Sequence, residues 1–231
     1  MKKRLNSVLT NGGLIESEIN VSEAHVIIPC GDITLEGILS KPDADGLYAG
    51  VVICHPHPMY GGDMYNNVVE AVYQELENRS IVALRFNFRG VGNSGGSVSD
   101  SSGNLDDVGA AIDYLLAVEG IDADRIGLVG YSYGGAMVLR HAPGNERVKA
   151  IATISPAMTP VDSDPILKYA KPKYFISGEK DGVVTLNKFE HLVGKVPEPK
   201  SYRIAAGVDH FWAGHEDVMA EDVVSFLQKT I

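Results

Sequence analysis

The chain has 231 residues and a formal net charge of −10, with 45% apolar, 22% charged and 7% aromatic residues. This composition is typical of a globular protein with a substantial core, and it excludes disordered, collagen-like and coiled-coil chains. The excess of acidic side chains repels phosphate backbones, so we expect no nucleic-acid partner. The length fits one α/β or all-β domain, and we expect residues 1–231 to form a single domain.

The N-terminus and the cysteines are typical of a cytoplasmic protein. Residues 5–11 are too few and too polar for the core of a signal peptide, and no later stretch reaches the length of a membrane span. We therefore expect no membrane partner. Cys30 and Cys54 cannot form a disulfide scaffold for a chain of this length, and we expect both thiols to be free.

The predicted elements begin with a hairpin, in which residues 26–28 and 33–39 flank the turn residues Gly31 and Asp32. From Tyr48 onward, short apolar runs typical of strands covered on both faces alternate with longer segments of helical period. The predicted strands are residues 51–54, 81–88, 126–129, 148–154, 174–177 and 202–205. The predicted helices cover residues 68–76, 105–115, a segment that follows Ser132, 186–192 and 219–227. This alternation predicts an α/β fold, with a mostly parallel sheet, helices on both faces and an antiparallel N-terminal edge.

Ser132 is the predicted nucleophile, because it lies in a G-x-S-x-G pattern at residues 130–134. This pattern marks a nucleophile elbow only where a strand precedes the serine and a helix follows it. Residues 126–129 and 135–139 meet that requirement. Ser94 matches the same pattern, but a loop without helical period follows it, so we interpret Ser94 as a loop residue.

A catalytic serine needs a general base, and the base needs a carboxylate that fixes its tautomer. In an α/β sheet with a nucleophile elbow, the acid follows the serine in the chain and the histidine follows the acid. His210 lies between the last predicted strand and the last predicted helix, where it could reach over the sheet, and His215 is the alternative. Asp181 lies in the loop after residues 174–177 and is the predicted acid, with Glu179 as its alternative.

The predicted oxyanion donors are the backbone N–H groups of Tyr133, which follows the nucleophile, and of a residue in the stretch 55–59, His-Pro-His-Pro-Met. Proline has no N–H, so the donors in this stretch are His57 and Met59, and we expect His57. His55 and His57 also resemble a pair of metal ligands. No third ligand residue lies nearby in sequence, and we expect no metal.

These features resemble the α/β-hydrolase superfamily. Residues 55–62 with Asn67, residues 86–94 and residues 130–134 are similar to small bacterial and archaeal hydrolases of the dienelactone-hydrolase-like or serine-aminopeptidase-like kind. The resemblance extends from about Gly31 to the C-terminus. It implies an eight-stranded, mostly parallel sheet, no cofactor, and hydrolysis of an ester-type bond.

The resemblance has a limit at the nucleophile, because dienelactone hydrolases proper use a cysteine where this chain has Ser132. Their particular substrate is therefore not carried over. The resemblance also implies that Arg89 shapes the loop beside the site, through a pair with Asp106 or Asp107.

The predicted site is open, because residues 156–172 leave room for only a short cap-like segment with a short helix at 165–170. An open site fits small or short-chain acyl esters or thioesters, and the expected partner is a small-molecule ester. The predicted substrate-binding residues are Met59, Tyr60, Tyr131 and Phe211. The favoured function is a serine carboxylesterase. The alternatives are a small peptidase or acyl-amino-acid hydrolase with the same triad, and a non-catalytic binding protein on a hydrolase fold.

Overall fold

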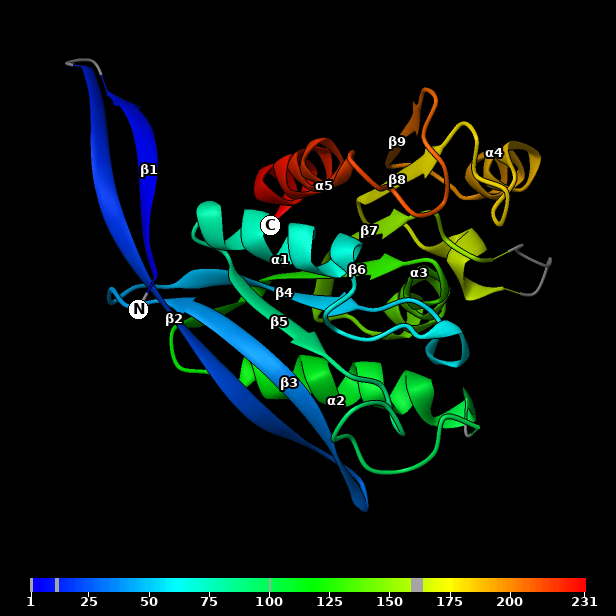
Figure 1. The fold of residues 1–231 in the computed structure, drawn as a ribbon, viewed down its shortest axis with the longest axis horizontal. Coiled ribbons are helices and arrows are strands. Elements are labelled where there is room, and N and C mark those ends of the chain that lie inside the picture. Colours follow the sequence, from blue (N-terminus) through cyan, green and yellow to red (C-terminus); the bar gives the residue numbers. More distant parts are fainter. Residues whose placement is uncertain (1, 11–12, 100, 159–163) are drawn as a thin grey trace.

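The computed structural model of this chain describes residues 2–10, 13–99, 101–158 and 164–231, with side chains described from Asn20 onward, Ser101 excepted. In this part of the chain, nine strands form one sheet in the order β1-β2-β3-β5-β4-β6-β7-β8-β9 (Figure 1). The strands are β1 Lys2–Thr10, β2 Gly13–Cys30, β3 Ile33–Pro42, β4 Tyr48–Cys54, β5 Val82–Phe86, β6 Ile121–Tyr131, β7 Val148–Ile154, β8 Lys173–Gly178 and β9 Lys200–Ala205. Strands β4 to β9 pair in parallel, whereas β1, β2 and β3 form an antiparallel edge.

The α/β fold class is therefore confirmed, but the expected number of eight strands is wrong. The additional strand is β1, which pairs with the first half of β2, from Lys2 opposite Val21 to Thr10 opposite Gly13. This hairpin stands out from the body of the molecule (Figure 1). Its first strand pairs with β2 alone and lacks the continuous apolar run by which the parallel strands were recognised.

The helices cover both faces of the sheet. They are α1 Asn67–Asn78, α2 Asn104–Leu116, α3 Tyr133–His141, α4 Leu186–Lys195 and α5 Glu216–Thr230. Buried side chains of α1 and α5 belong to one core cluster, and those of α2, α3 and α4 belong to the other. Because β4 to β8 contribute to both clusters, each of these strands is apolar on both faces, as expected for a covered parallel sheet.

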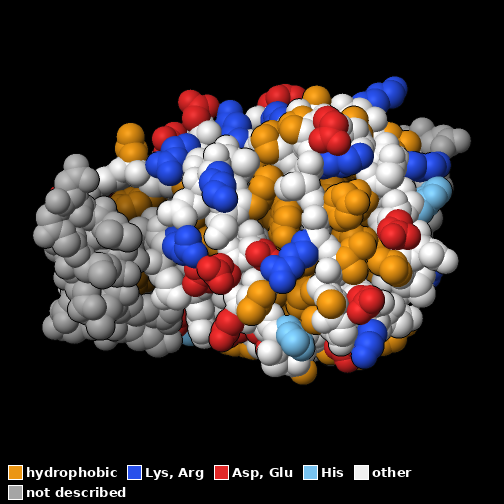
Figure 2. All heavy atoms as spheres, turned by 90° about the horizontal axis from the view of Figure 1, so that it is seen from above, with side chains coloured by type: hydrophobic (Ala, Val, Ile, Leu, Met, Phe, Trp, Pro, Cys, Tyr) orange, Lys and Arg blue, Asp and Glu red, His pale blue; other side chains and the backbone are white. Residues whose placement is uncertain are grey.

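The surface outside these cores is mixed. On the face that carries α1 and α5, acidic and basic side chains are scattered around hydrophobic ones (Figure 2). No helix among the described residues combines the length and the apolar character needed to cross a bilayer. The two cysteines are buried and free, as expected.

The predicted cap-like segment at 156–172 is described only in part, because residues 159–163 lie outside the described residues. Its described portion contains one short 3-10 helix, Pro165–Lys168, in place of the expected helix at 165–170.

Candidate active site

The candidate site lies at the carboxyl edge of the parallel strands, where ligands bind in open α/β sheets. Ser132 directly follows β6, and His57 lies three residues after the end of β4. Asp181 follows β8, and His210 follows β9. Because these strands run parallel, the sheet brings loops that are far apart in sequence to one edge.

The elbow at Ser132 has the strained geometry that the sequence pattern predicts. Ser132 has φ 52° and ψ −113°, and its N–H donates to the carbonyl of Ile154 on the neighbouring strand at 2.9 Å. A Cβ atom at Gly130 would collide with the backbone of Gly134, and one at Gly134 would collide with the backbone of Cys54. Only glycine fits at either position, so the two glycines permit the turn that presents the serine hydroxyl.

The structure brings the three predicted residues Ser132, His210 and Asp181 together, and they are called the triad below. His210 Nε2 lies 3.0 Å from Ser132 Oγ, and His210 Nδ1 lies 2.8 Å from Asp181 Oδ2. The carboxylate of Asp181 is an acceptor, so Nδ1–H donates to it and Nε2 is left to accept the serine O–H. The side chain of Asp181 is fully buried and that of His210 is 8% exposed.

Asp181 is held in its ionised form by its surroundings. Burial acts to raise the pKa of this carboxyl, but hydrogen bonds from His210, from the N–H of Val184 and from Ser155 together hold the pKa below its usual value. The N–H groups of Val183 and Val184 donate to Oδ1 at 2.9 and 2.7 Å. The loop therefore fixes one carboxylate oxygen while the other faces His210.

Ser155 and Trp212 support the acid, and the sequence reasoning did not identify them. Ser155 follows β7 at the same edge of the sheet and donates to Asp181. The Trp212 Nε1–H donates to Ser155 Oγ at 3.2 Å, so one hydroxyl links the indole to the carboxylate. Both residues are buried. The position of Ser155 at a strand end was a signal, but a single serine outside any motif did not stand out.

The two predicted oxyanion donors have free N–H groups. Among the described residues, the N–H of His57 and the N–H of Tyr133 have no hydrogen-bond acceptor. The alternative donor differs, because the N–H of Met59 already donates to His57 Nδ1 at 3.1 Å. The rings of His57 and Tyr133 contact each other, with centroids 4.5 Å apart. The two residues that carry the free N–H groups, His57 and Tyr133, thus contact each other beside Ser132.

His55 has a structural role. Its Nε2 accepts from the N–H of Phe88 at 3.0 Å and its Nδ1–H donates to the carbonyl of Pro56 at 2.7 Å. Burial lowers the pKa of His55 to about 4, so the ring is neutral at pH 7. Both ring nitrogens are therefore occupied, and no three potential metal ligands lie together among the described residues. These contacts do not favour the interpretation of His55 and His57 as metal ligands.

Three of the four predicted substrate-binding residues lie on the surface beside the triad loops. Met59, Tyr60 and Phe211 are exposed by 69%, 89% and 64%. Tyr131 is different, because it is buried and its hydroxyl donates to the carbonyl of His210 at 2.8 Å. These contacts do not favour the prediction that Tyr131 binds substrate. Its side chain points into the core and holds the backbone of the base.

The alternatives from the sequence have other partners. Glu179 accepts the N–H of Gly207 at 2.8 Å, and His215 is the N-cap residue of α5. Ser94 is buried and its hydroxyl donates to the carbonyl of Asn87 at 2.7 Å, as expected for a structural loop residue.

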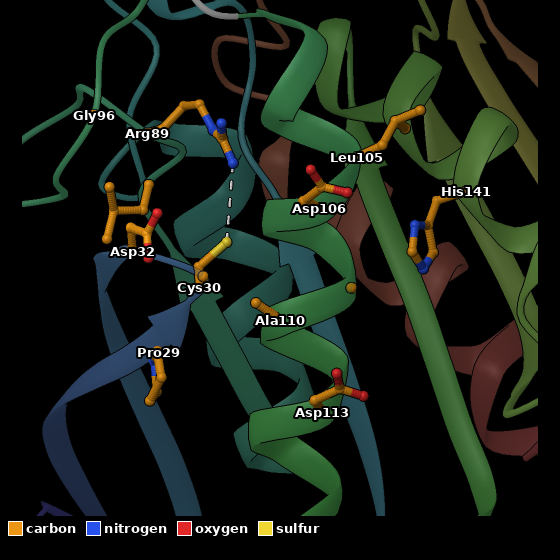
Figure 3. Close-up of a pocket in the computed structure, with 13 residues that line it drawn as sticks. Pro29, Cys30, Asp32, Arg89, Gly96, Leu105, Asp106, Ala110, Asp113 and His141 are labelled. Atoms are coloured by element: carbon orange, nitrogen blue, oxygen red, sulfur yellow. Dashed lines mark hydrogen bonds between the residues drawn. The ribbon is translucent and has the colours of Figure 1, made fainter.

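Arg89 pairs with Asp107, one of its two expected partners, through Nε and Nη2. Beside this pair, a hollow of about 730 Å³ lies between the β2–β3 turn and α2, where Cys30, Asp106 and Asp113 line it (Figure 3). None of the triad residues lines this hollow. It is therefore separate from the candidate active site.

Comparisons with known proteins show relatives of this chain in sequence and in fold. An uncharacterized protein of Rickettsia prowazekii, RP471, is 27% identical over 201 residues, which is 84% of each chain. An α/β serine hydrolase homologue from Coxiella burnetii superposes with a TM-score of 0.76 at 27% identity, over 87% of this chain and 96% of that one. Est1E from Butyrivibrio proteoclasticus, solved with ferulic acid bound, superposes with a TM-score of 0.80 at 21% identity, over 89% and 98% of the two chains.

The family comparison covers the residues of the candidate site. The model of the dienelactone hydrolase family matches residues 95–217, which is more than half of the chain and includes Ser132, Asp181 and His210. Together with the sheet order and the serine hydrolase neighbours, this match shows that the chain is a hydrolase of the α/β serine hydrolase fold and belongs to the dienelactone hydrolase family.

Proposed function

We propose that this chain is a serine carboxylesterase that hydrolyses esters or thioesters of small or short-chain acyl groups. The observation that carries the proposal is the continuous series of hydrogen bonds from Ser132 Oγ through His210 to Asp181, at 3.0 and 2.8 Å. A buried carboxylate, a correctly oriented imidazole and a serine on a strained elbow are the groups that acyl transfer requires.

In the first half of the reaction, His210 Nε2 accepts the proton of Ser132 while Oγ attacks the ester carbonyl carbon. The carbonyl oxygen gains negative charge, which the free N–H groups of His57 and Tyr133 are placed to stabilise. When the tetrahedral intermediate collapses, the C–O bond to the alcohol breaks and His210 donates its proton to the leaving oxygen. The acyl group is then attached to Ser132.

In the second half, a water molecule gives a proton to His210 as its oxygen attacks the acyl carbon. The bond to Ser132 Oγ breaks, the serine recovers its proton from His210, and the carboxylic acid leaves. Asp181 remains ionised throughout, since the hydrogen bonds that lower its pKa favour the carboxylate. Its role is to hold the His210 tautomer and to stabilise the imidazolium.

The comparisons support the esterase function in one further way. Est1E shares the fold and binds ferulic acid, a carboxylic acid of the kind that ester hydrolysis releases. The exposed apolar side chains of Met59, Tyr60 and Phe211 offer this chain a surface for the apolar parts of an ester.

Labelling with a fluorophosphonate, followed by peptide mapping, tests the proposal. We expect the label on Ser132 in the wild type and no label in Ser132→Ala. A panel of p-nitrophenyl esters and aminoacyl anilides then separates the reactions, and we expect turnover of the esters. Turnover of the anilides alone would indicate a peptidase, and a chain that neither labels nor turns over any substrate would not be an esterase.

A further inference from the structure

A small pocket adjoins the triad on the side of the acid. It has a volume of about 150 Å³ and lies between the loop after β7 and the loop that carries Asp181. Its walls are four apolar residues and one lysine: Ala157, Met158, Val183, Val184 and Lys188.

The walls of this pocket are bonded to the triad. The N–H of Ala157 donates to the carbonyl of Ser132 at 3.0 Å, so one wall is fixed to the nucleophile. The N–H groups of Val183 and Val184 donate to Asp181, so the opposite wall is fixed to the acid. The pocket therefore keeps a constant position relative to the serine hydroxyl.

The reaction geometry decides which part of a substrate can enter. The carbonyl oxygen must face the N–H groups of His57 and Tyr133, and the leaving oxygen must lie near His210 Nε2 to receive its proton. The third substituent on the carbonyl carbon is the acyl chain. The recess beside Ala157 is available for that chain, because neither the oxyanion donors nor His210 line it.

The dimensions and polarity of the pocket limit the chain. A volume of 150 Å³ equals the space of roughly five water molecules, so about five heavy atoms fit. Met158 and Val184 are buried and apolar, whereas Lys188 is exposed. Lys188 lies in the first turn of α4, which contains no acidic residue, and it makes no hydrogen bond or ion pair with any described residue.

We propose that this pocket binds the acyl chain, and that Lys188 selects chains of about five atoms that end in a carboxylate. The substrates are then half-esters of short dicarboxylic acids, such as the succinate class. This inference rests on the proposed esterase function. A net charge of −10 repels anions from the molecule as a whole, so a local ammonium is needed to hold such a substrate.

Two methyl esters of nearly equal shape test the charge. Monomethyl succinate and methyl 4-methylpentanoate differ in whether the chain ends in a carboxylate or in an isopropyl group, and acid release is followed by pH-stat titration. We expect kcat/KM to favour the succinate by about tenfold or more, which is about 1.4 kcal/mol. Lys188→Met should abolish the preference and Lys188→Arg should restore part of it. Lys195→Met, in the last turn of the same helix, is the matched control and should leave it unchanged.

Filling the pocket tests its assignment to the acyl chain. Ala157→Leu should lower kcat/KM for both five-atom chains about tenfold or more relative to kcat/KM for methyl acetate. An unchanged preference in Lys188→Met, or an equal loss of kcat/KM on methyl acetate in Ala157→Leu, would each overturn the inference. In those cases the wild type still turns over methyl acetate and labels at Ser132, and the esterase proposal stands. If the wild type neither turned over methyl acetate nor labelled at Ser132, the esterase proposal and this inference would both be wrong.

Discussion

Ser132, Ser155 and Trp212 each have a backbone with positive φ, at 52°, 42° and 61°. Each such residue costs about 1–3 kcal/mol, and it persists only where the surrounding structure fixes it. These three residues lie in one hydrogen-bonded group, because Trp212 donates to Ser155, which in turn donates to Asp181 beside His210 and Ser132. The strain is therefore concentrated where the proposed chemistry needs a fixed geometry.

Two serines in the same sequence pattern allow a matched test of the nucleophile. We expect Ser132→Ala to lower kcat by about 10⁴ to 10⁶ without loss of the fold, because the triad acts as a unit. Ser94→Ala should keep kcat and instead lower the free energy of unfolding by about 1–3 kcal/mol. The physical reason is that Ser94 bonds the buried Asn87 carbonyl and the N–H of Glu36. Steady-state kinetics and urea unfolding measure the two effects, and the reverse pattern would place the nucleophile at Ser94.

The hydrogen bond from Ser155 to Asp181 leads to a pH prediction. This bond favours the ionised acid, so Ser155→Ala should raise the pKa of Asp181. Asp181 then gains its proton at a higher pH, which a 13C NMR titration of its carboxyl carbon measures directly. Ser177→Ala is the control, because Ser177 lies in β8 and its buried hydroxyl has no partner among the described residues. If the carboxyl of Asp181 titrates at the same pH in the two variants, Ser155 does not support the acid.

At the scale of elements, the sequence predicted the parallel part of the fold well. The run at residues 148–154 has the same bounds as β7, and each of the other predicted strands overlaps an observed one. These strands are apolar on both faces, so a continuous run marks them clearly. The sequence did not predict strand β1, because its residues are largely polar and contain no continuous apolar run. Its pairing with β2 uses backbone hydrogen bonds, which the sequence does not reveal.

The candidate site was predictable where a motif and a strand end coincide. Ser132 met both conditions, whereas Asp181 and His210 were predicted from the strand ends that they follow and from their order in the chain. The structure brings the three residues within hydrogen-bond distance. Tyr131 was predicted to bind substrate because it is an aromatic residue near a strand end, a position that is as often in the core. Alternation within a strand places neighbouring side chains on opposite sides, and only the packed structure reveals that this one faces the core.

The loop after β4 allows a test of the oxyanion donor. Replacing the amide between Pro56 and His57 by an ester removes the N–H of His57 with little change of shape. We expect this to lower kcat about 10² to 10³-fold, the usual effect of losing one donor. The same replacement at Met59 should have a small effect, because that N–H already donates to the His57 ring. His57→Ala keeps the backbone donor and should retain most of the rate. A large loss at Met59 alone would move the donor there.

The same loop should make stability depend on pH through His55. The unfolded imidazole gains a proton below about pH 6.5, whereas burial lowers the folded pKa to about 4. Between these values the unfolded state binds more protons, so stability falls as the pH falls. We expect His55 to account for a loss of about 2 kcal/mol between pH 7 and pH 5, measured by urea unfolding. This part should vanish in His55→Gln and persist in His191→Gln, which changes an exposed histidine of α4.

At the scale of the whole molecule, the sheet has a part that helices cover on both faces and a hairpin that projects from it (Figure 1). Strands β4 to β8 contribute to both core clusters, with α1 and α5 on one face and α2, α3 and α4 on the other. The β1–β2 hairpin extends away from this body (Figure 1). Its strands pair with each other from Val21 outward, whereas β2 pairs with β3 only from Val21 to Cys30. The second half of β2 belongs to the main sheet, since Ile28 is fully buried.

This division predicts that the projecting hairpin can be removed. A chain that starts at Asn20 should keep kcat/KM within about twofold and unfold cooperatively, because an isolated two-stranded hairpin adds little stability. A chain that starts at Pro29 should fail to fold, since it removes the partner of β3 and the buried Ile28. Circular dichroism, thermal unfolding and ester turnover on the two shortened chains measure this. If the chain from Asn20 lost its fold, or lost activity more than about tenfold, the hairpin would belong to the structural unit that supports Ser132, His210 and Asp181.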